Sequence, residues 1–207
     1  MMIQYIQYLC QGRVGCIIHH IMNNTLIFLR HAPTLKDPNV PNDQWGIKPE
    51  SIDLLTELSN LSDFQNINLI YSSTKTKAIQ TALTFANKNS LNTIQVSELG
   101  EIKKPGAEKL SVEDYDKLKI QILSDFNFSV NNSETANQAL DRFTAAVAKI
   151  NTENECKKVL IVSHGITMTL YFAKLQNQFP NILNRWEKLK FGNYGIIQNE
   201  IITKDII

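Results

Sequence analysis

Two histidines in this sequence stand at the ends of apolar runs. Arg30 and His31 follow the run at residues 25–29, and His164 follows the run that ends at Ser163. A neutral imidazole is a nucleophile, and a guanidinium beside it can hold an oxyanion through two parallel hydrogen bonds. These residue types therefore indicate nucleophilic chemistry on an anionic group.

Short unbroken apolar runs are typical of strands buried on both faces of a parallel sheet, and apolar residues at helical spacing predict helices between them. The predicted order is strand 25–30, helix 50–61, strand 67–71, helix 75–87, strand 93–96, helices 111–126 and 133–150, strand 158–163, helix 166–175, an amphipathic segment 182–186 and one or two strands within 194–202. The alternation predicts a single-domain α/β fold, a three-layer sandwich with a mostly parallel central sheet flanked by helices.

Four of the predicted strands are followed by polar groups. These groups are Arg30 with His31, residues 72–77, Glu101, and Ser163 with His164. Because the carboxyl ends of parallel strands share one edge of a sheet, we expect the four groups to meet there. The helix that begins near residue 166 points its N-terminus at the same edge, which favours an anion nearby. A lone strand-end histidine is more often structural, but two of them favour a site.

The first predicted helix carries a row of apolar residues at helical spacing. This spacing predicts that one helix face packs on the sheet. The residues are Ile52, Leu54, Leu55, Leu58 and Leu61.

Composition excludes several function classes. The 207 residues carry a formal net charge of +1, which gives no general attraction for nucleic acid or for a membrane surface, so any anion site must be local. Cys10, Cys16 and Cys156 are scattered and form no C-x-x-C pair, which argues against a zinc site or a redox pair. We expect a reduced, cytoplasmic setting.

Two segments of the chain depart from the regular alternation of strands and helices. Residues 1–24 mix apolar residues with glutamines and predict an extension of uncertain status outside a domain at 25–207. Met22 is a plausible alternative start, which would place residues 1–21 upstream of the translated sequence. Residues 102–132 break the alternation, and we expect an insertion over the active-site edge.

Several segments, in order along the chain, resemble motifs of one family. Residues 29–34 (L-R-H-A-P-T) resemble the R-H-G-x-T signature of the histidine phosphatase superfamily, phosphoglycerate mutase-like branch. Residues 72–82 resemble its S-S-x-x-x-R-A-x-Q-T-A segment, residues 99–101 its L-x-E, and residues 162–165 its V-S-H-G. Glu134-Thr135 with Arg142 is similar to the E-S and R of its following helix. The resemblance runs from residue 25 to the C-terminus.

The resemblance implies a metal-independent phosphatase that needs no cofactor and works through a phosphohistidine. His31 would attack phosphorus, while Arg30, Lys77 and His164 would surround the phosphoryl oxygens. Glu101 would protonate the leaving oxygen and then activate water. The substrate would be a small-molecule phosphoester or a phosphoprotein.

The sequence departs from the family pattern at three places. Lys77 stands where the family usually has arginine, and Ala32 replaces a glycine. The residues after Glu101 lack the usual glycine and Trp-Glu-Gly pattern, so Glu98 or an acid from residues 102–132 remains an alternative proton donor. Three other functions stay open: phosphoglycerate mutase-type phosphotransfer, for which we see no arginine-rich patch after the acid, dephosphorylation of phosphohistidine in proteins, and a catalytically weak phospho-ligand binding module. Substrate identity and oligomeric state are open as well.

Overall fold

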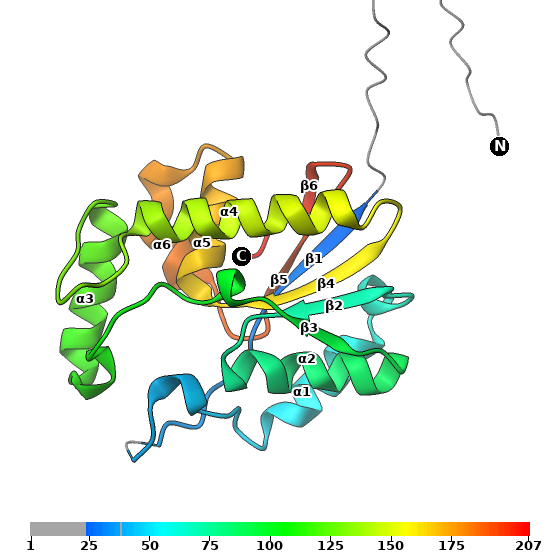
Figure 1. The fold of residues 1–207 in the computed structure, drawn as a ribbon, viewed down its shortest axis with the longest axis horizontal. Coiled ribbons are helices and arrows are strands. Elements are labelled where there is room, and N and C mark those ends of the chain that lie inside the picture. The colour runs from blue at the N-terminus through cyan, green and yellow to red at the C-terminus, as the bar shows by residue number, and fades with distance from the viewer. Residues whose placement is uncertain (1–23, 38) are drawn as a thin grey trace, which may run out of the picture.

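The computed structural model describes residues 24–37 and 39–207, so the predicted extension lies outside them except for Asn24. A six-stranded sheet forms the middle layer in the order β3-β2-β4-β1-β5-β6 (Figure 1). The first four in that order pair in parallel, and the last two add an antiparallel edge. The strands are β1 (Thr25–Arg30), β2 (Leu69–Ser72), β3 (Thr93–Gln95), β4 (Lys158–Ser163), β5 (Tyr194–Gln198) and β6 (Ile201–Lys204).

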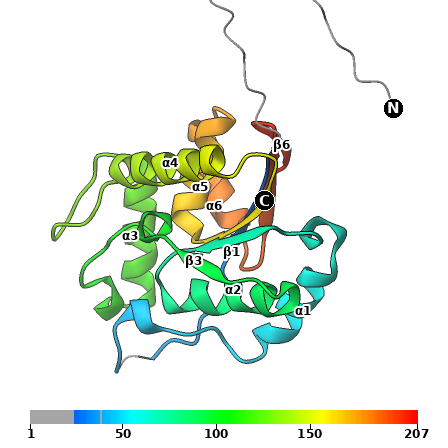
Figure 2. The ribbon, with the colours of Figure 1, turned by 45° about the vertical axis from the view of Figure 1, so that its right-hand side comes forward.

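Helices cover both faces of the sheet (Figures 1 and 2). One face carries α1 (Ser51–Asn60) and α2 (Thr76–Asn89), and the other carries α4 (Ala136–Glu153), α5 (Gly165–Leu175) and α6 (Ile182–Lys188), with α3 (Val112–Ser124) beside α6. This arrangement confirms the predicted three-layer α/β fold. Among the described residues, no helix combines the length and the apolar character needed to cross a membrane.

The sheet has a hydrophobic core on each of its two faces, because successive side chains of a strand point to opposite faces. In β1, Leu26 and Phe28 point to the layer of α4 and α5, whereas Ile27 and Leu29 point to the layer of α1 and α2. Phe28 meets the ring of Phe172 edge to face at a centroid distance of 5.4 Å. Because both faces of β1 are buried, its register is fixed, and with it the place where the strand ends.

The prediction for the apolar face of α1 is only partly correct. Leu55 is fully buried and Leu58 partly, but Ile52, Leu54 and Leu61 are 46%, 37% and 44% exposed. The reason is that α1 packs alongside α2, so a narrower stripe is covered than a helix lying flat on the sheet would bury.

The predicted start of the helix near residue 133 is wrong by two to three residues. The helix α4 begins at Ala136, and Thr135 caps it in a capping box with Gln138. Glu134 therefore lies outside the helix, where its carboxylate is free to bind a different element.

Candidate active site

The carboxyl ends of the central strands open into a cavity of about 1080 Å³. Its lining includes all five residues that the sequence singles out. The structure thus brings together groups from four separate strand ends: Arg30, His31, Lys77, Glu101 and His164.

His31 presents one ring nitrogen in its basic form. Its Nδ1 lies 2.8 Å from the carbonyl oxygen of Ala32, and because a carbonyl only accepts, Nδ1 carries the hydrogen and Nε2 keeps a lone pair. Burial lowers the pKa of His31 well below its usual range, and the neighbouring His164 and Lys77 lower it further. The ring is therefore neutral near pH 7. Ala32 is not among the residues with positive φ, so replacing the family's glycine needs no strained backbone.

His164 lies beside His31, with the two ring centroids 5.0 Å apart. Its Nε2 is 2.6 Å from the hydroxyl oxygen of Ser73, which follows β2. Burial lowers the pKa of His164 well below its usual range, and the charges of Lys77 and Lys104 act in the same direction. Two neutral imidazoles thus lie edge to face at the ends of β1 and β4.

Arg30 is held in place by aromatic rings and one carbonyl. Its guanidinium carbon lies 4.2 Å from the Phe191 ring centroid and 5.1 Å from that of Trp186, and Nη1 donates to the oxygen of Leu189 at 2.6 Å. Burial lowers the pKa of Arg30 to about 10, so the group stays charged at neutral pH. Its buried Nε has no hydrogen-bond partner among the described residues, which leaves a donor unused.

Lys77 lies in the first turn of α2 and is buried. Its Nζ donates to both the backbone oxygen and Oδ1 of Asn42, each at 3.2 Å. Burial lowers the pKa of Lys77 to about 8, although the charge of Glu101 opposes that shift. Lys77 therefore supplies a positive charge that begins to disappear just above neutral pH.

Glu101 places its carboxylate on the N-terminus of α5. Oε1 accepts from the backbone N–H groups of Ile102 at 3.0 Å and Thr167 at 3.2 Å, and Oε2 accepts from Ile166 at 3.0 Å. Burial acts to raise the pKa of Glu101, but the charge of Lys104 and the three amide donors outweigh it and hold the pKa below its usual value. The anion that this helix N-terminus favours is thus one of the protein's own side chains.

Glu98 is poorly placed as an alternative acid. It is exposed, it accepts a hydrogen bond from Ser97 at 2.8 Å, and it does not line the cavity. Asp116, from residues 102–132, does line the cavity and forms an ion pair with Lys119. Glu101 is the carboxylate that lies among the other candidate residues.

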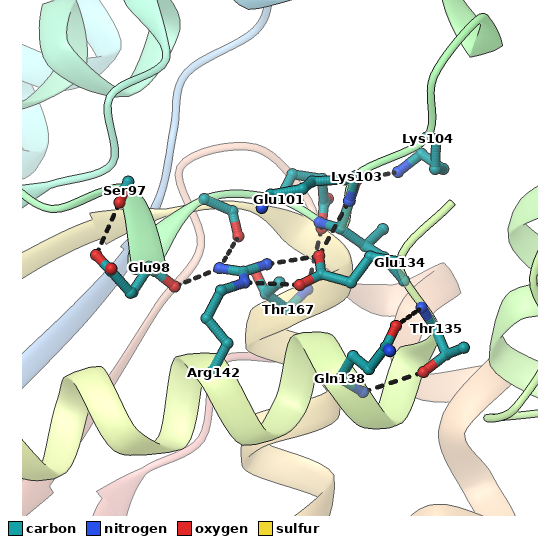
Figure 3. A network of polar contacts seen from close by, with 12 residues as sticks. Ser97, Glu98, Glu101, Lys103, Lys104, Glu134, Thr135, Gln138, Arg142 and Thr167 are labelled. Carbon is teal, nitrogen blue, oxygen red and sulfur yellow. Dashed lines mark hydrogen bonds and ion pairs between the residues drawn. The ribbon is translucent and has the colours of Figure 1, made fainter. Parts of the chain in front are cut away.

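A network anchored on α4 holds the loop that carries Glu101 (Figure 3). Arg142 binds both carboxylate oxygens of Glu134, at 2.7 and 2.8 Å, and donates to the backbone oxygens of Glu98 and Gly100. Glu134 also accepts from the backbone N–H of Lys103 at 3.1 Å. The loop is thus clamped on both sides of Glu101.

Replacing Arg142 with methionine should destabilise the protein and impair the site together. The Glu134 side chain, which is only 10% exposed, would lose its partner, so we expect the free energy of unfolding to fall by about 2 kcal/mol, measured by urea denaturation. Lys149→Met is the matched control on the same helix, because Lys149 is exposed. Equal stability of the two variants would contradict a structural role for the network.

The sequence reasoning missed a set of cations and rings in the cavity. The aromatic side chains of Trp45, Tyr115, Trp186 and Phe191 line it. So do six lysines besides Lys77: Lys36, Lys48, Lys75, Lys103, Lys104 and Lys119. Tyr115 and Lys119 are one helical turn apart, which places them on the same face of a helix. Together with the consecutive pair Lys103 and Lys104, this spacing is the signal that could have revealed part of the set.

No group of three or more His, Cys, Asp or Glu side chains in the described part of the chain is arranged to hold a metal ion.

Solved structures with this fold include several named as phosphatases. An alpha-ribazole phosphatase from Shigella flexneri is 20% identical with a TM-score of 0.67, covering 87% of this chain and 94% of its own. A phosphoserine phosphatase mutant from Entamoeba histolytica, in complex with phosphoserine, is 18% identical with a TM-score of 0.68 and covers 87% and 94%. YhfR from Bacillus stearothermophilus is 18% identical with a TM-score of 0.68 and covers 87% and 95%. These likenesses show a shared fold.

Sequence comparison with curated proteins finds no match. A family model, in contrast, matches residues 26–201, which run from the second residue of β1 to the first residue of β6. The chain belongs to the histidine phosphatase superfamily (branch 1).

Proposed function

We propose that this protein is a metal-independent phosphatase that hydrolyses a phosphomonoester through a phosphohistidine on His31. The observation that carries the proposal is the hydrogen bond from His31 Nδ1 to the oxygen of Ala32, which leaves Nε2 with a lone pair inside a cationic cavity. Family membership and the phosphatases named among proteins of the same fold support the assignment.

In the first step, His31 Nε2 attacks phosphorus and the bond from phosphorus to the ester oxygen breaks. The leaving oxygen takes that bonding pair and a proton from Glu101. Arg30 and Lys77 neutralise charge on the three other phosphoryl oxygens, and His164 donates a hydrogen bond to one of them. The resting carboxylate must acquire a proton for this role, and the negative charge of the incoming phosphate favours that uptake.

In the second step, water attacks the phosphohistidine. Glu101, now a carboxylate, takes the proton from that water, and the phosphorus–nitrogen bond breaks with its electron pair returning to Nε2. Inorganic phosphate leaves, and His31 regains its neutral form. The backbone donors from Ile166 and Thr167 keep the Glu101 carboxylate in one orientation for both steps.

Hydrolysis of p-nitrophenyl phosphate in excess chelator tests the proposal. We expect turnover that resists the chelator and disappears in His31→Ala. The alternative is a binding module that keeps the anion pocket but turns over poorly, and the engagement of Lys77 by Asn42 favours it. Tight binding of inorganic phosphate without turnover of any phosphoester would select the binding module.

The pKa of Lys77 predicts how activity depends on pH. Lysine is charged below its pKa, so kcat/KM should fall as the pH rises through about 8. Lys77→Arg should raise kcat/KM and remove this fall, because arginine stays charged and its planar fork holds two oxygens. A pH profile from 6 to 10 for both proteins is the measurement. If kcat/KM of Lys77→Arg fell with rising pH as it does in the wild type, the fall would belong to another group.

A further inference from the structure

The guanidinium of Arg30 is held by α6 and by the residues that follow this helix. Its Nη1 donates to the backbone oxygen of Leu189 at 2.6 Å, and its guanidinium carbon lies 5.1 and 4.2 Å from the ring centroids of Trp186 and Phe191. No described residue forms a hydrogen bond with Nη2, so this nitrogen is left for a phosphoryl oxygen. The direction of that donor therefore depends on where the end of α6 lies.

The helix α6 is tied to the segment after β6 by a buried ion pair. Arg185 is 5% exposed, and its Nη1 and Nη2 donate to the two carboxylate oxygens of Asp205 at 3.0 and 2.7 Å. Burial acts to raise the pKa of Asp205, but the hydrogen bonds from Arg185 oppose it and the pKa stays below its usual value, so the carboxylate is charged at neutral pH. Two parallel hydrogen bonds between planar groups fix their orientation as well as their distance.

Asp205 is itself anchored to the sheet. The backbone N–H of Ile206 donates to Oδ1 of Asp205 at 2.7 Å, and the Ile206 side chain is 1% exposed. This side chain reaches β5 because the residue there is Gly195, where a Cβ would lie only 2.4 Å from Cγ2 of Ile206. Since β5 pairs with β1, the strand that ends at Arg30, the anchor and the phosphate ligand share one rigid sheet.

A line of contacts runs from the ion pair to Arg30. The backbone oxygen of Arg185 accepts from the N–H of Leu189 at 3.1 Å, and the oxygen of Leu189 accepts from Arg30. Trp186, the next residue on α6, also lies against Arg30. Gly165 leaves room for this contact, because a Cβ there would lie 2.4 Å from the Trp186 ring and 3.1 Å from the guanidinium carbon. A shift of α6 would therefore move both the acceptor and the ring that hold Arg30.

We infer that Asp205 and Arg185 are positioning residues for phosphoryl transfer, because their ion pair sets the place of α6 and thereby the orientation of the Arg30 guanidinium. The inference rests on the proposed function, since it takes Arg30 as a ligand of the phosphoryl group. Neither Asp205 nor Arg185 lines the cavity, so they act through Arg30. Apolar side chains of similar volume often stabilise a fold as well as a buried ion pair does, but they lack its fixed direction.

A double-mutant cycle of Asp205→Asn with Arg30→Met tests the inference. With Arg30 present, Asp205→Asn should lower kcat/KM for p-nitrophenyl phosphate, per folded protein, by about tenfold or more, because a displaced ligand stabilises the transition state less well. In Arg30→Met the same substitution should change kcat/KM by less than about twofold. Equal losses in the two backgrounds would overturn the inference, since a general loss of stability acts alike in both.

Asp63→Asn is the matched control. Asp63 lies 3.6 Å from the Nζ of Lys204, the residue just before Asp205, and it lies outside the cavity lining. The control thus removes an ion pair at the same edge of the sheet that does not involve α6. We expect its kcat/KM to stay within about twofold of wild type. A loss as large as that in Asp205→Asn would contradict a route through α6. Should Asp205→Asn impair folding, Arg185→Lys repeats the cycle, because lysine keeps the charge and loses the second hydrogen bond.

The proposed function and the positioning role fail in different ways. NMR of the arginine Nε–H groups reports on Arg30 without turnover, and its signal is assigned by its loss in Arg30→Met. We expect Asp205→Asn to shift that signal and Asp63→Asn to leave it unchanged. A shift in a protein that hydrolyses no phosphoester removes the phosphatase and keeps the link from Asp205 to Arg30. An unshifted signal overturns the positioning role, whether or not the protein is an active phosphatase.

Discussion

Replacing His31 with alanine is expected to lower kcat for p-nitrophenyl phosphate by at least about 10⁴-fold, because the nucleophile and the covalent intermediate disappear together. Arg30, Lys77 and His164 would remain to bind the phosphate. KM, or the dissociation constant of inorganic phosphate, should therefore change far less than kcat.

His31→Asn is a second variant that tests the same prediction should His31→Ala impair folding. The asparagine amide can still donate to the oxygen of Ala32, as Nδ1 of the histidine does, but it has no basic nitrogen to attack phosphorus. We expect the same loss of kcat with an unchanged near-ultraviolet circular dichroism spectrum.

Trapping the intermediate gives an independent readout. Wild-type protein quenched in base during turnover should gain the mass of one phosphoryl group on the peptide that contains His31, and quenching in acid should remove it, because phosphohistidine is acid-labile. Turnover that persists in both His31 variants would mean that a different group attacks phosphorus.

The sequence was sufficient to predict that the candidate site residues meet at one edge of the sheet, for a physical reason. The runs that end at Arg30 and Ser163 are apolar on both faces, so each can only be an interior strand, and its last residue defines the sheet edge. Polar residues that follow such strands are carried to that edge whatever the loops do. The positions of His31 and His164 therefore depend on local pattern alone.

The second half of the cavity could not be predicted in this way. Tyr115 and Lys119 belong to α3, Trp186 to α6 and Lys104 to the loop before them, and their meeting depends on how these elements pack on one another. No periodicity in the sequence encodes that packing. Lysines rather than arginines occupy this part of the cavity wall.

The boundary of residues 102–132 as an insertion stays a prediction. These residues do contribute α3 and part of the cavity wall, including Lys103, Lys104, Tyr115 and Lys119. Substitutions in this segment can change which ligands the cavity accepts, while the strand-end residues stay in place. In the proposed phosphatase, substrate choice and chemistry would thus be carried by different parts of one fold.

Glu101 connects these two parts, because its carboxylate is bound by α5 and is influenced by Lys104. The proposed mechanism places two demands on it. The amide donors and Lys104 favour the carboxylate, which is the form that mechanism needs to activate water, whereas its first step needs the protonated form. The phosphate dianion of the substrate supplies the opposing negative charge.

Glu101→Gln should therefore lower kcat by about 10²–10⁴-fold for an alkyl phosphate such as propyl phosphate, whose leaving oxygen needs a proton. With p-nitrophenyl phosphate the leaving group departs as a stable anion, so we expect a rapid burst of p-nitrophenolate followed by slow turnover, since water attack still lacks its base. Stopped-flow absorbance measures both phases.

Glu98→Gln is the matched control, since Glu98 was the competing acid and lies outside the cavity lining. We expect its kcat to stay within about twofold of wild type for both esters, as is usual for surface substitutions of small effect. A large loss in Glu98→Gln, with Glu101→Gln fully active, would transfer the acid–base role to Glu98. A large loss in Glu101→Gln without any burst would instead indicate that the carboxylate is needed before the phosphohistidine forms, even when the leaving group requires no proton.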